Sequence, residues 1–353
     1  MQIEFSFSSV VDILSIATAF MLGLLFLTIK SKNKRANIFL CLFLWSLTVE
    51  VYNAFSHNFT ETITPVLETT LFTILFLILY VNLTINNTFK KWFLVLFIPG
   101  ILLNIVFFFN NEMDDFRPLE YLFNIGLLLY ILKILKQHKN HVTNYYSDLE
   151  HKTLSWIKAI VFVFLGFHVF WITEDIIAFQ NEDIATHFAL LSSILTLFMI
   201  YWIGYNGFSQ SEIFKNKLFT TTEEIIQVKN EIAPSSDETN DKFEKLKEKI
   251  ISDKLFTNTE LNLRSLSESL GVKEKELSSL INTHAKTNFY QFINHFRVDE
   301  FKRLLQSPKA KQLSILGLAQ EAGFKSKSTF YTAFKSIEGM TPKAFELSLK
   351  MSE

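Results

Sequence analysis

Long apolar stretches dominate the first two hundred residues of this 353-residue chain and limit what it can fold into. A helix needs about 20 apolar residues to cross ~30 Å of hydrocarbon. Seven stretches reach that length, although Lys133 and Lys158 interrupt the fifth and the sixth. The predicted spans are 8–29, 36–56, 63–85, 92–110, 118–136, 154–174 and 184–206. We therefore predict a seven-helix transmembrane domain over residues 1–206, with lipid as one of its partners.

Basic residues are unevenly divided between the loops that join these stretches. KSKNKR at 30–35, FKK at 89–91 and the loop 136–153 are rich in lysine, whereas the alternate loops contain a single basic residue, Arg117. The positive-inside rule then places the N-terminus outside and residue 207 onward in the cytoplasm. The first stretch lacks a basic n-region, so we predict a retained span, not a cleaved signal peptide.

Ionisable residues inside the predicted spans fall mostly in their outer halves. Charges within a span are costly and usually face the bundle interior or a wet cavity. One interpretation is an outward-opening acidic pocket for a cationic ligand, a proton or a metal ion; the other is that headgroups solvate these side chains. The candidate ligand-binding residues are Glu50, Glu68, His168 and Asp175. Their spacing matches no zinc motif, and the single cysteine, Cys41, excludes an intramolecular disulfide, so no metal site and no cofactor is predicted.

The chain changes character after the last apolar stretch. Residues 207–241 are predicted to be a cytoplasmic linker, in which APSSDETND at 233–241 has little to bury and favours a flexible hinge. Residues 242–353 carry 19 Lys and Arg against 13 Asp and Glu, while the preceding residues carry a net negative charge. Such asymmetry suggests a nucleic-acid partner for the basic part.

Two segments of this basic part repeat one pattern of helix, glycine turn and helix. Ser267 precedes Gly271 by four residues, and Ala319 precedes Gly323 by the same spacing. A small residue there lets two helices cross closely, and the glycine permits the turn. A long helix from Asn288 to about Gln306 joins the two units. The chain is therefore predicted to be all-α, and two such units on a spacer can place recognition helices in successive major grooves, ~34 Å apart.

Local signals define further features of this part. An amphipathic helix is predicted over 242–256, and Ser314 is a predicted N-cap. Aromatic residues at helical spacing are predicted to belong to the core instead of stacking on bases. In the long helix they are Phe289, Phe292, Phe296 and Phe301, and in the second unit they are Phe324, Phe330 and Phe334.

Four stretches have fixed spacings that resemble a known family: LSSLIN (277–282), NFYQFINHFRVDEFKRLL (288–305), AGFKSKSTFYTAFK (322–335) and GMTPKAF (339–345). They resemble the DNA-binding domain of the AraC/XylS family of bacterial transcription regulators, across nearly all of 255–347. The resemblance implies a non-enzymatic regulator that binds double-stranded promoter DNA. Joined to the predicted spans, it is similar to membrane-bound members of the family, which implies a multi-pass protein of the bacterial inner membrane.

The resemblance also implies which residues contact DNA. Serine and threonine hydroxyls stand where many members of the family place a long Arg or Gln. Hydroxyl side chains discriminate poorly between bases. Phosphate contacts would then supply much of the affinity. The implied base-reading residues are Lys275, Ser278 and Ser279 on the first recognition helix, and Lys327, Ser328, Tyr331 and Thr332 on the second; Lys325 and Lys335 are the implied phosphate contacts.

Three functions remain open on this sequence. The first is a membrane-embedded transcription regulator whose bundle senses an unidentified small ligand, with ligand-dependent homodimerisation raising the local concentration of DNA-binding domains. The second is a membrane transporter or enzyme with a regulatory tail, although HExxH, phosphate-loop and inverted-repeat patterns are lacking. The third is a membrane-anchored regulator released by proteolysis near Ser235.

Overall fold

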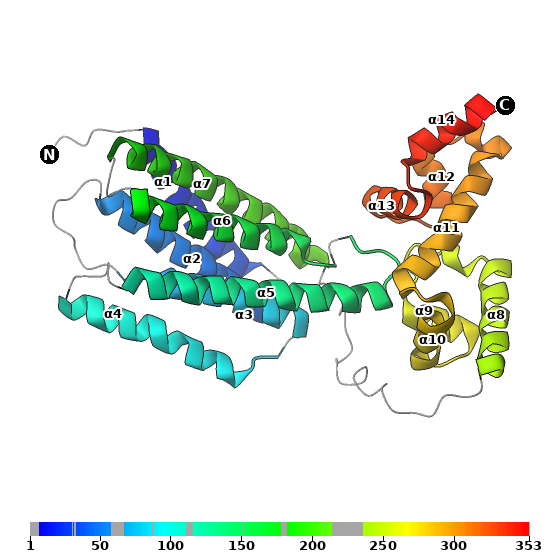
Figure 1. Cartoon of the computed structure of the whole chain (residues 1–353), viewed down its shortest axis with the longest axis horizontal. Coiled ribbons are helices and arrows are strands. Elements are labelled where there is room, and N and C mark those ends of the chain that lie inside the picture. The colour runs from blue at the N-terminus through cyan, green and yellow to red at the C-terminus, as the bar shows by residue number, and fades with distance from the viewer. Residues whose placement is uncertain are drawn as a thin grey trace. The chain divides into compact units, whose positions relative to one another are not determined.

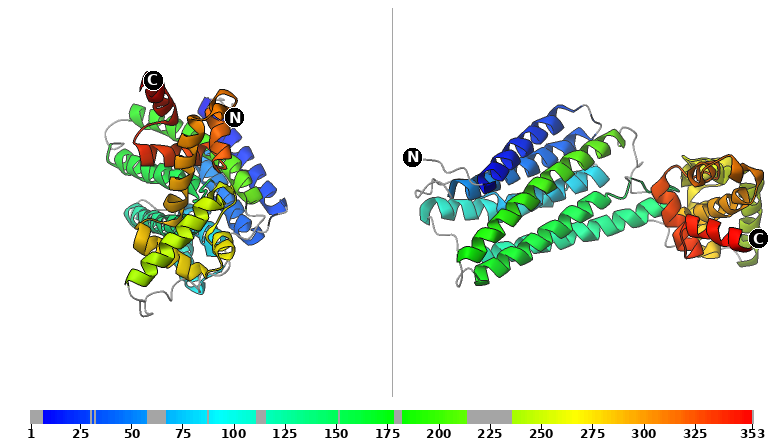
Figure 2. Two further views of the ribbon diagram at one scale, coloured as in Figure 1. Left: turned by 90° about the vertical axis from the view of Figure 1, so that its right-hand side faces the viewer. Right: turned by 90° about the horizontal axis from the view of Figure 1, so that it is seen from above.

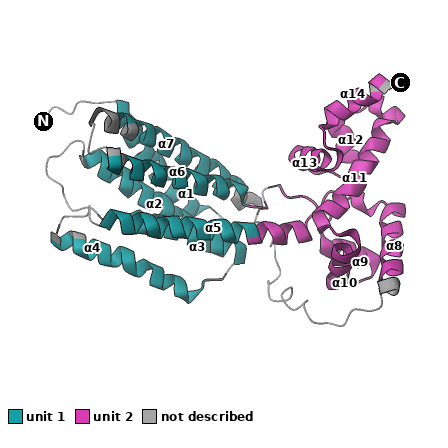
Figure 3. Cartoon of the chain, viewed as in Figure 1, with its two compact units in different colours: residues 1–136, 154–221 teal, residues 137–153, 222–353 magenta. Residues whose placement is uncertain are grey.

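The chain divides into two compact units of helices (Figures 1 and 3). A computed structural model describes residues 7–29, 31, 33–57, 67–86, 88–110, 116–150, 152–177, 182–213 and 236–352. The first unit comprises residues 1–136 and 154–221, and the second comprises 137–153 and 222–353. In the described ranges the elements are helical, in agreement with the predicted all-α class. The segment 137–153, which follows the fifth apolar stretch, therefore belongs with the C-terminal helices.

The first unit is a bundle of apolar helices that run lengthwise beside one another (Figure 2). Its helices pack in the spatial order α3, α2, α1, α7, α6, and α4 packs on α3. One continuous core of buried aliphatic and aromatic side chains runs between them. The elements are α1 Phe7–Thr28, α2 Lys34–His57, α3 Thr70–Asn86, the 3₁₀ helix η1 Lys91–Phe97, α4 Ile98–Asn110, α5 Arg117–Tyr145, α6 Ser155–Ile177 and α7 Glu182–Ile213.

Within the described residues, five helices are long and apolar enough to cross a membrane. Two further apolar helices, Thr70–Asn86 and Lys91–Val106, are shorter. Each of the seven predicted spans contains a helix, and the composition of these helices is compatible with membrane association. Seven membrane crossings and their orientation stay predictions.

The second unit contains two small hydrophobic cores that share the long helix α11, Phe289–Leu305. Phe289 and Ile293 lie in the first core, and Val298 and Phe301 lie in the second. The predicted aromatic core is confirmed: among its members only Phe296 is partly exposed, and its ring stacks on Phe256. The remaining elements are α8 Ser236–Ser252, η4 Leu255–Thr257, α9 Leu263–Leu270, α10 Glu274–Leu280, η5 Ile281–Ala285, η6 Pro308–Lys311, α12 Ile315–Glu321, α13 Lys327–Glu338 and α14 Pro342–Ser352.

Helix boundaries follow the predicted caps, with one difference. The side chain of Ser314 accepts a hydrogen bond from the Gly317 amide at 3.1 Å, as expected for an N-cap. Helix α8 begins at Ser236, earlier than the predicted start at 242, so the end of the predicted hinge is helical. The carboxylate of Asp241 pairs with Lys245 one turn later at 2.7 Å, and acidic residues favour a helix N-terminus. The linker residues 214–235, including Ser235, lie outside the described residues.

Both turn glycines adopt left-handed backbone conformations, but their surroundings differ. Gly271 has φ +70°, and nothing lies within 4 Å of the position that a Cβ would occupy. Gly323 has φ +99°, and its Cβ would lie 2.6 Å from the carbonyl oxygen of Phe256 and 2.7 Å from the Cα of Thr257. The second turn thus needs glycine both for its backbone conformation and for its contact with η4.

We predict that Gly323→Ala destabilises the second unit by about 3 kcal/mol or more, because strain and a backbone clash add together. The matched variant Gly271→Ala meets only the left-handed strain, about 1–2 kcal/mol. Hydrogen exchange of the α12 and α13 amides in the whole chain measures both effects. Equal losses of protection in the two variants would show that the contact with η4 is unimportant.

Candidate nucleic-acid interface and bundle cavity

The second helices of the two helix-turn-helix units, α10 and α13, present polar faces to solvent. Helix α10 buries Leu277 and Leu280, and α13 buries Phe330 and Phe334. This burial turns the residues implied to contact DNA outward. Lys275, Ser279, Lys325, Lys327, Ser328, Thr332 and Lys335 are exposed, and Ser278 and Tyr331 are half-buried. Their accessibility agrees with the predicted role, while contact with DNA stays a prediction.

The polar face of α13 is ordered at its N-terminus. Ser326 is the N-cap, and its hydroxyl oxygen accepts a hydrogen bond from the amide of Thr329 at 3.1 Å. The ammonium group of Lys327 lies 5.7 Å from the ring centroid of Tyr331, one turn further along the helix. Lys325 forms an ion pair with Glu260 at 2.5 Å. A phosphate contact by Lys325 would therefore have to replace this pair.

The end of α5 and the residues after it dock onto these C-terminal helices. We call residues 145–148 the docking segment; Figure 3 colours it with the second unit. Ser147 donates two hydrogen bonds to the carbonyl oxygen of Leu261, at 2.6 Å from its hydroxyl and 3.4 Å from its amide. Tyr146 forms an isolated antiparallel bridge with Asn262, and Tyr145 packs against the first core. Asn262 is the N-cap of α9, so the segment is fixed to the start of the first helix-turn-helix unit.

A buried arginine on α11 holds the docking segment from the other side. Arg297 is 0% exposed, and its guanidinium donates to the carbonyl oxygens of Phe256 and Asn258, both at 2.8 Å. It also donates to the carbonyl oxygen of Ser147 at 3.3 Å, and Asn294 donates to the same oxygen at 3.1 Å. Burial lowers the pKa of Arg297 to about 10, which leaves it charged at neutral pH.

The docking segment reaches the second helix-turn-helix unit through Asp148. This carboxylate is 5% exposed and accepts hydrogen bonds from the hydroxyls of Thr329 at 2.5 Å and Ser326 at 3.3 Å. Its other oxygen pairs with Lys152 at 3.2 Å. Thr329 lies on the buried face of α13, opposite the exposed lysines. Asp148 therefore contacts the inner side of α13 and leaves its polar face accessible.

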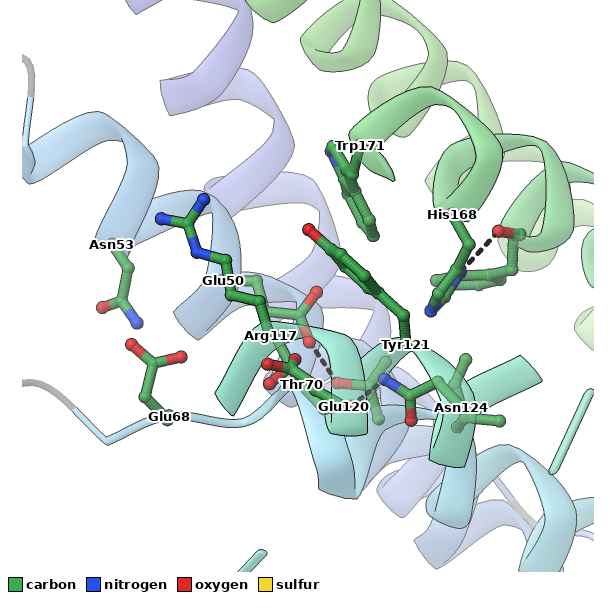
Figure 4. Close-up of a pocket in the computed structure, with 13 residues that line it drawn as sticks. Glu50, Asn53, Glu68, Thr70, Arg117, Glu120, Tyr121, Asn124, His168 and Trp171 are labelled. Atoms are coloured by element: carbon green, nitrogen blue, oxygen red, sulfur yellow. Dashed lines mark hydrogen bonds between the residues drawn. The ribbon is translucent and has the colours of Figure 1, made fainter. Parts of the chain in front are cut away.

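The first unit contains a cavity of about 300 Å³ lined by acidic, amide and aromatic side chains (Figure 4). The carboxylates come from Glu50 on α2, Glu68 before α3 and Glu120 on α5. The rings of Tyr121, His168 and Trp171 lie grouped together, with ring centroids 6.0 Å apart for Tyr121 and His168 and 5.5 Å apart for His168 and Trp171. The remaining lining residues are Asn53, Thr70, Thr73, Ile74, Arg117, Asn124 and Phe164.

Charges in this cavity are only partly compensated. Arg117, the lining cation, forms an ion pair with Asp175 at 2.8 Å, and Tyr121 donates to the same carboxylate at 2.7 Å. Glu50 accepts a hydrogen bond from the Thr73 hydroxyl. With Arg117 already paired, the three lining glutamates make this cavity a candidate site for a cation.

The structure brings together three of the four predicted ligand-binding residues. Glu50, Glu68 and His168 line one cavity, and Asp175 contacts it through Arg117 and Tyr121. Sequence reasoning missed Thr70, Tyr121 and Asn124 in the cavity lining, the docking segment, and the contact of Arg297 with that segment. A signal for Arg297 was available, because it follows the aromatic core residues Phe292 and Phe296 on the predicted helix 288–305.

Comparison with known families identifies the C-terminal part. Residues 266–347 match the family model described as a helix-turn-helix domain, which is of the AraC type. Searches of curated proteins and of solved structures gave no match for the chain. The second unit thus carries an AraC-type DNA-binding domain, and the predicted resemblance is confirmed for this part of the chain.

We predict that Arg297→Met lowers the stability of the second unit by about 3–5 kcal/mol, because three carbonyl oxygens lose a buried donor. Hydrogen exchange at the amides of 146–149 in the whole chain should accelerate strongly. The matched variant is Arg264→Met on α9, whose guanidinium pairs with the exposed Glu268 and should change stability by less than about 1 kcal/mol. Similar effects of the two variants would contradict the role given to Arg297.

Proposed function

We propose that this chain is a membrane-embedded transcription regulator in which the apolar bundle senses a signal and controls sequence-specific DNA binding by the second unit. The AraC-type domain supports the DNA-binding role, and the polar faces of α10 and α13 supply its contact surfaces. Five helices compatible with a membrane support the embedded location. The predicted loop charges place the DNA-binding unit in the cytoplasm.

The observation that carries the regulatory part of this proposal is the docking segment. It contacts Leu261 before α9, Arg297 on α11 and Thr329 on α13, so one short segment touches both helix-turn-helix units and the helix between them. A displacement of the segment would therefore change how α10 and α13 are held. Two recognition helices bind adjacent half-sites only when their separation fits the DNA repeat.

Helix α5 provides the route by which the bundle acts on this segment. Its first turns supply Arg117, Glu120, Tyr121 and Asn124 to the cavity, and its last residue, Tyr145, begins the docking segment. A signal that shifts α5 is transmitted through a continuous helix and does not depend on the linker 207–241. This route favours direct control of the second unit through α5 over control by clustering of several chains. Dimerisation can still raise the avidity for DNA.

DNA binding by the whole chain tests the proposed function. The protein in lipid nanodiscs would select duplexes from a random library, and we expect enrichment of two half-sites spaced by about one helical turn, ~10 base pairs. Affinity should fall steeply with salt because lysines contact phosphates. Recovery of duplexes without any shared sequence would contradict a sequence-specific regulator.

We expect Lys327→Ala to weaken binding to the selected DNA by about 5-fold or more and to alter base preference at one position of the second half-site. The matched control is Lys249→Ala on α8, an exposed lysine outside both helix-turn-helix units, which should bind as the unchanged chain does. Equal affinities for the two variants, measured by fluorescence anisotropy, would remove α13 from the interface.

A further inference from the structure

The cavity of the first unit contains hydrogen-bond acceptors that lack donors. Asn124 is 3% exposed, and its Nδ2 donates to the carbonyl oxygen of Thr70 at 3.4 Å, which fixes the orientation of the amide. Its Oδ1 is buried without a hydrogen-bond partner, as is the Oδ1 of Asn53, whose Nδ2 donates to Leu67. Both amides line the cavity. A buried acceptor without a donor is costly, so these oxygens indicate a bound group that carries N–H or O–H donors.

His168 adds a further acceptor on the side of the cavity where the rings gather. Its Nδ1 lies 2.7 Å from the carbonyl oxygen of Phe164, which can only accept, so Nδ1 carries the proton. The neutral ring then presents Nε2 as an acceptor. The lining glutamates are acceptors as well when ionised. Apart from the Thr70 hydroxyl, which can donate or accept, the unpaired hydrogen-bonding groups described here are acceptors.

The aromatic residues indicate what kind of donor fits. Tyr121, His168 and Trp171 present ring faces and edges on one side of the cavity (Figure 4). Ring faces attract organic cations, and a tryptophan does so most strongly. Metal ions in proteins need several converging ligands, and among the described residues no three His, Cys, Asp or Glu side chains are placed to share one. An ammonium ion combines positive charge, N–H donors and a carbon body that can contact rings.

We propose that this cavity binds a small organic ammonium ion that keeps at least one N–H donor. The ammonium group bonds to the carboxylate of Glu50, with Glu68 and Oδ1 of Asn124 as the acceptors that line the cavity on either side of it, and the carbon body contacts Tyr121 and Trp171. At about 300 Å³ the cavity suits a ligand at the small end of the usual range. The expected change in DNA affinity when the ligand binds rests on the proposed function, whereas the ligand site itself does not.

Saturation-transfer NMR on the whole chain in nanodiscs tests the site with three matched probes. Benzylamine carries charge and N–H donors, benzyltrimethylammonium carries charge without donors, and benzyl alcohol is neutral. We expect saturable binding of benzylamine, at least 10-fold weaker binding of the quaternary ion, and none of the alcohol. Equal binding of all three probes, or no binding of benzylamine, would overturn the proposal. Zinc ion, added as a separate probe, would overturn it if zinc bound and benzylamine did not.

Variants locate the site and separate it from the proposed function. Glu50→Gln and Glu68→Gln keep the shape of the side chain and should each lower the affinity for benzylamine by about 10-fold. The control is Asp12→Asn, which changes a buried carboxyl group on α1 outside the cavity and should leave this affinity unchanged. Unchanged binding in both glutamine variants would overturn the site. Benzylamine binding without any change in DNA affinity would support the site and contradict signal sensing by the bundle. DNA binding without benzylamine binding would contradict the site and leave the DNA-binding function standing.

Discussion

A buried guanidinium fixes the geometry on which the C-terminal unit depends. Arg297 lies on the helix shared by both hydrophobic cores and donates to backbone oxygens of η4, of Asn258 and of Ser147. Taking a guanidinium out of water is costly unless its donors are satisfied. The carbonyl groups that satisfy it come from segments far apart in the sequence. Loss of one of these segments leaves the charge with fewer partners, so the position of the docking segment and the packing of the two DNA-reading units are energetically linked.

In the proposed function, helix α5, which runs from Arg117 to Tyr145, is the route by which the apolar bundle acts on the second unit. The flexible linker predicted over 207–241 would favour control by clustering of chains, which needs no fixed contact, but 207–213 belong to α7 and 236–241 belong to α8. The docking segment offers a more specific device, because Asp148 contacts the inner side of α13 while the exposed lysines stay accessible. In the proposed function, control acts on how α10 and α13 are held and leaves the surface proposed to bind DNA accessible.

Local signals in the sequence were sufficient for the elements of the second unit. The N-cap at Ser314, the turn glycines and the buried phenylalanines all depend on near neighbours, and the structure has them where they were expected. The docking segment could not be found in this way. YYSDLE resembles an ordinary polar loop, and the residue that accepts from Thr329 is 181 positions away from it. The cavity shows the same division: Glu50 and His168 are conspicuous because polarity within an apolar stretch is costly, whereas Asn124 and Tyr121 carry little such signal.

A disulfide between the docking segment and α13 tests the central claim most directly. The single cysteine, Cys41, would be replaced by alanine, and Asp148→Cys would be combined with Thr329→Cys in the whole chain. The combination Tyr146→Cys with Asn262→Cys, which replaces an antiparallel bridge between the docking segment and the start of α9, serves as the positive control, because bridged residues lie within disulfide distance. After mild oxidation in native membranes, mass spectrometry should find both cross-linked peptides. A cross-link in the control pair alone would show that residue 148 does not dock on α13, and would contradict the proposed control of DNA binding by the apolar bundle.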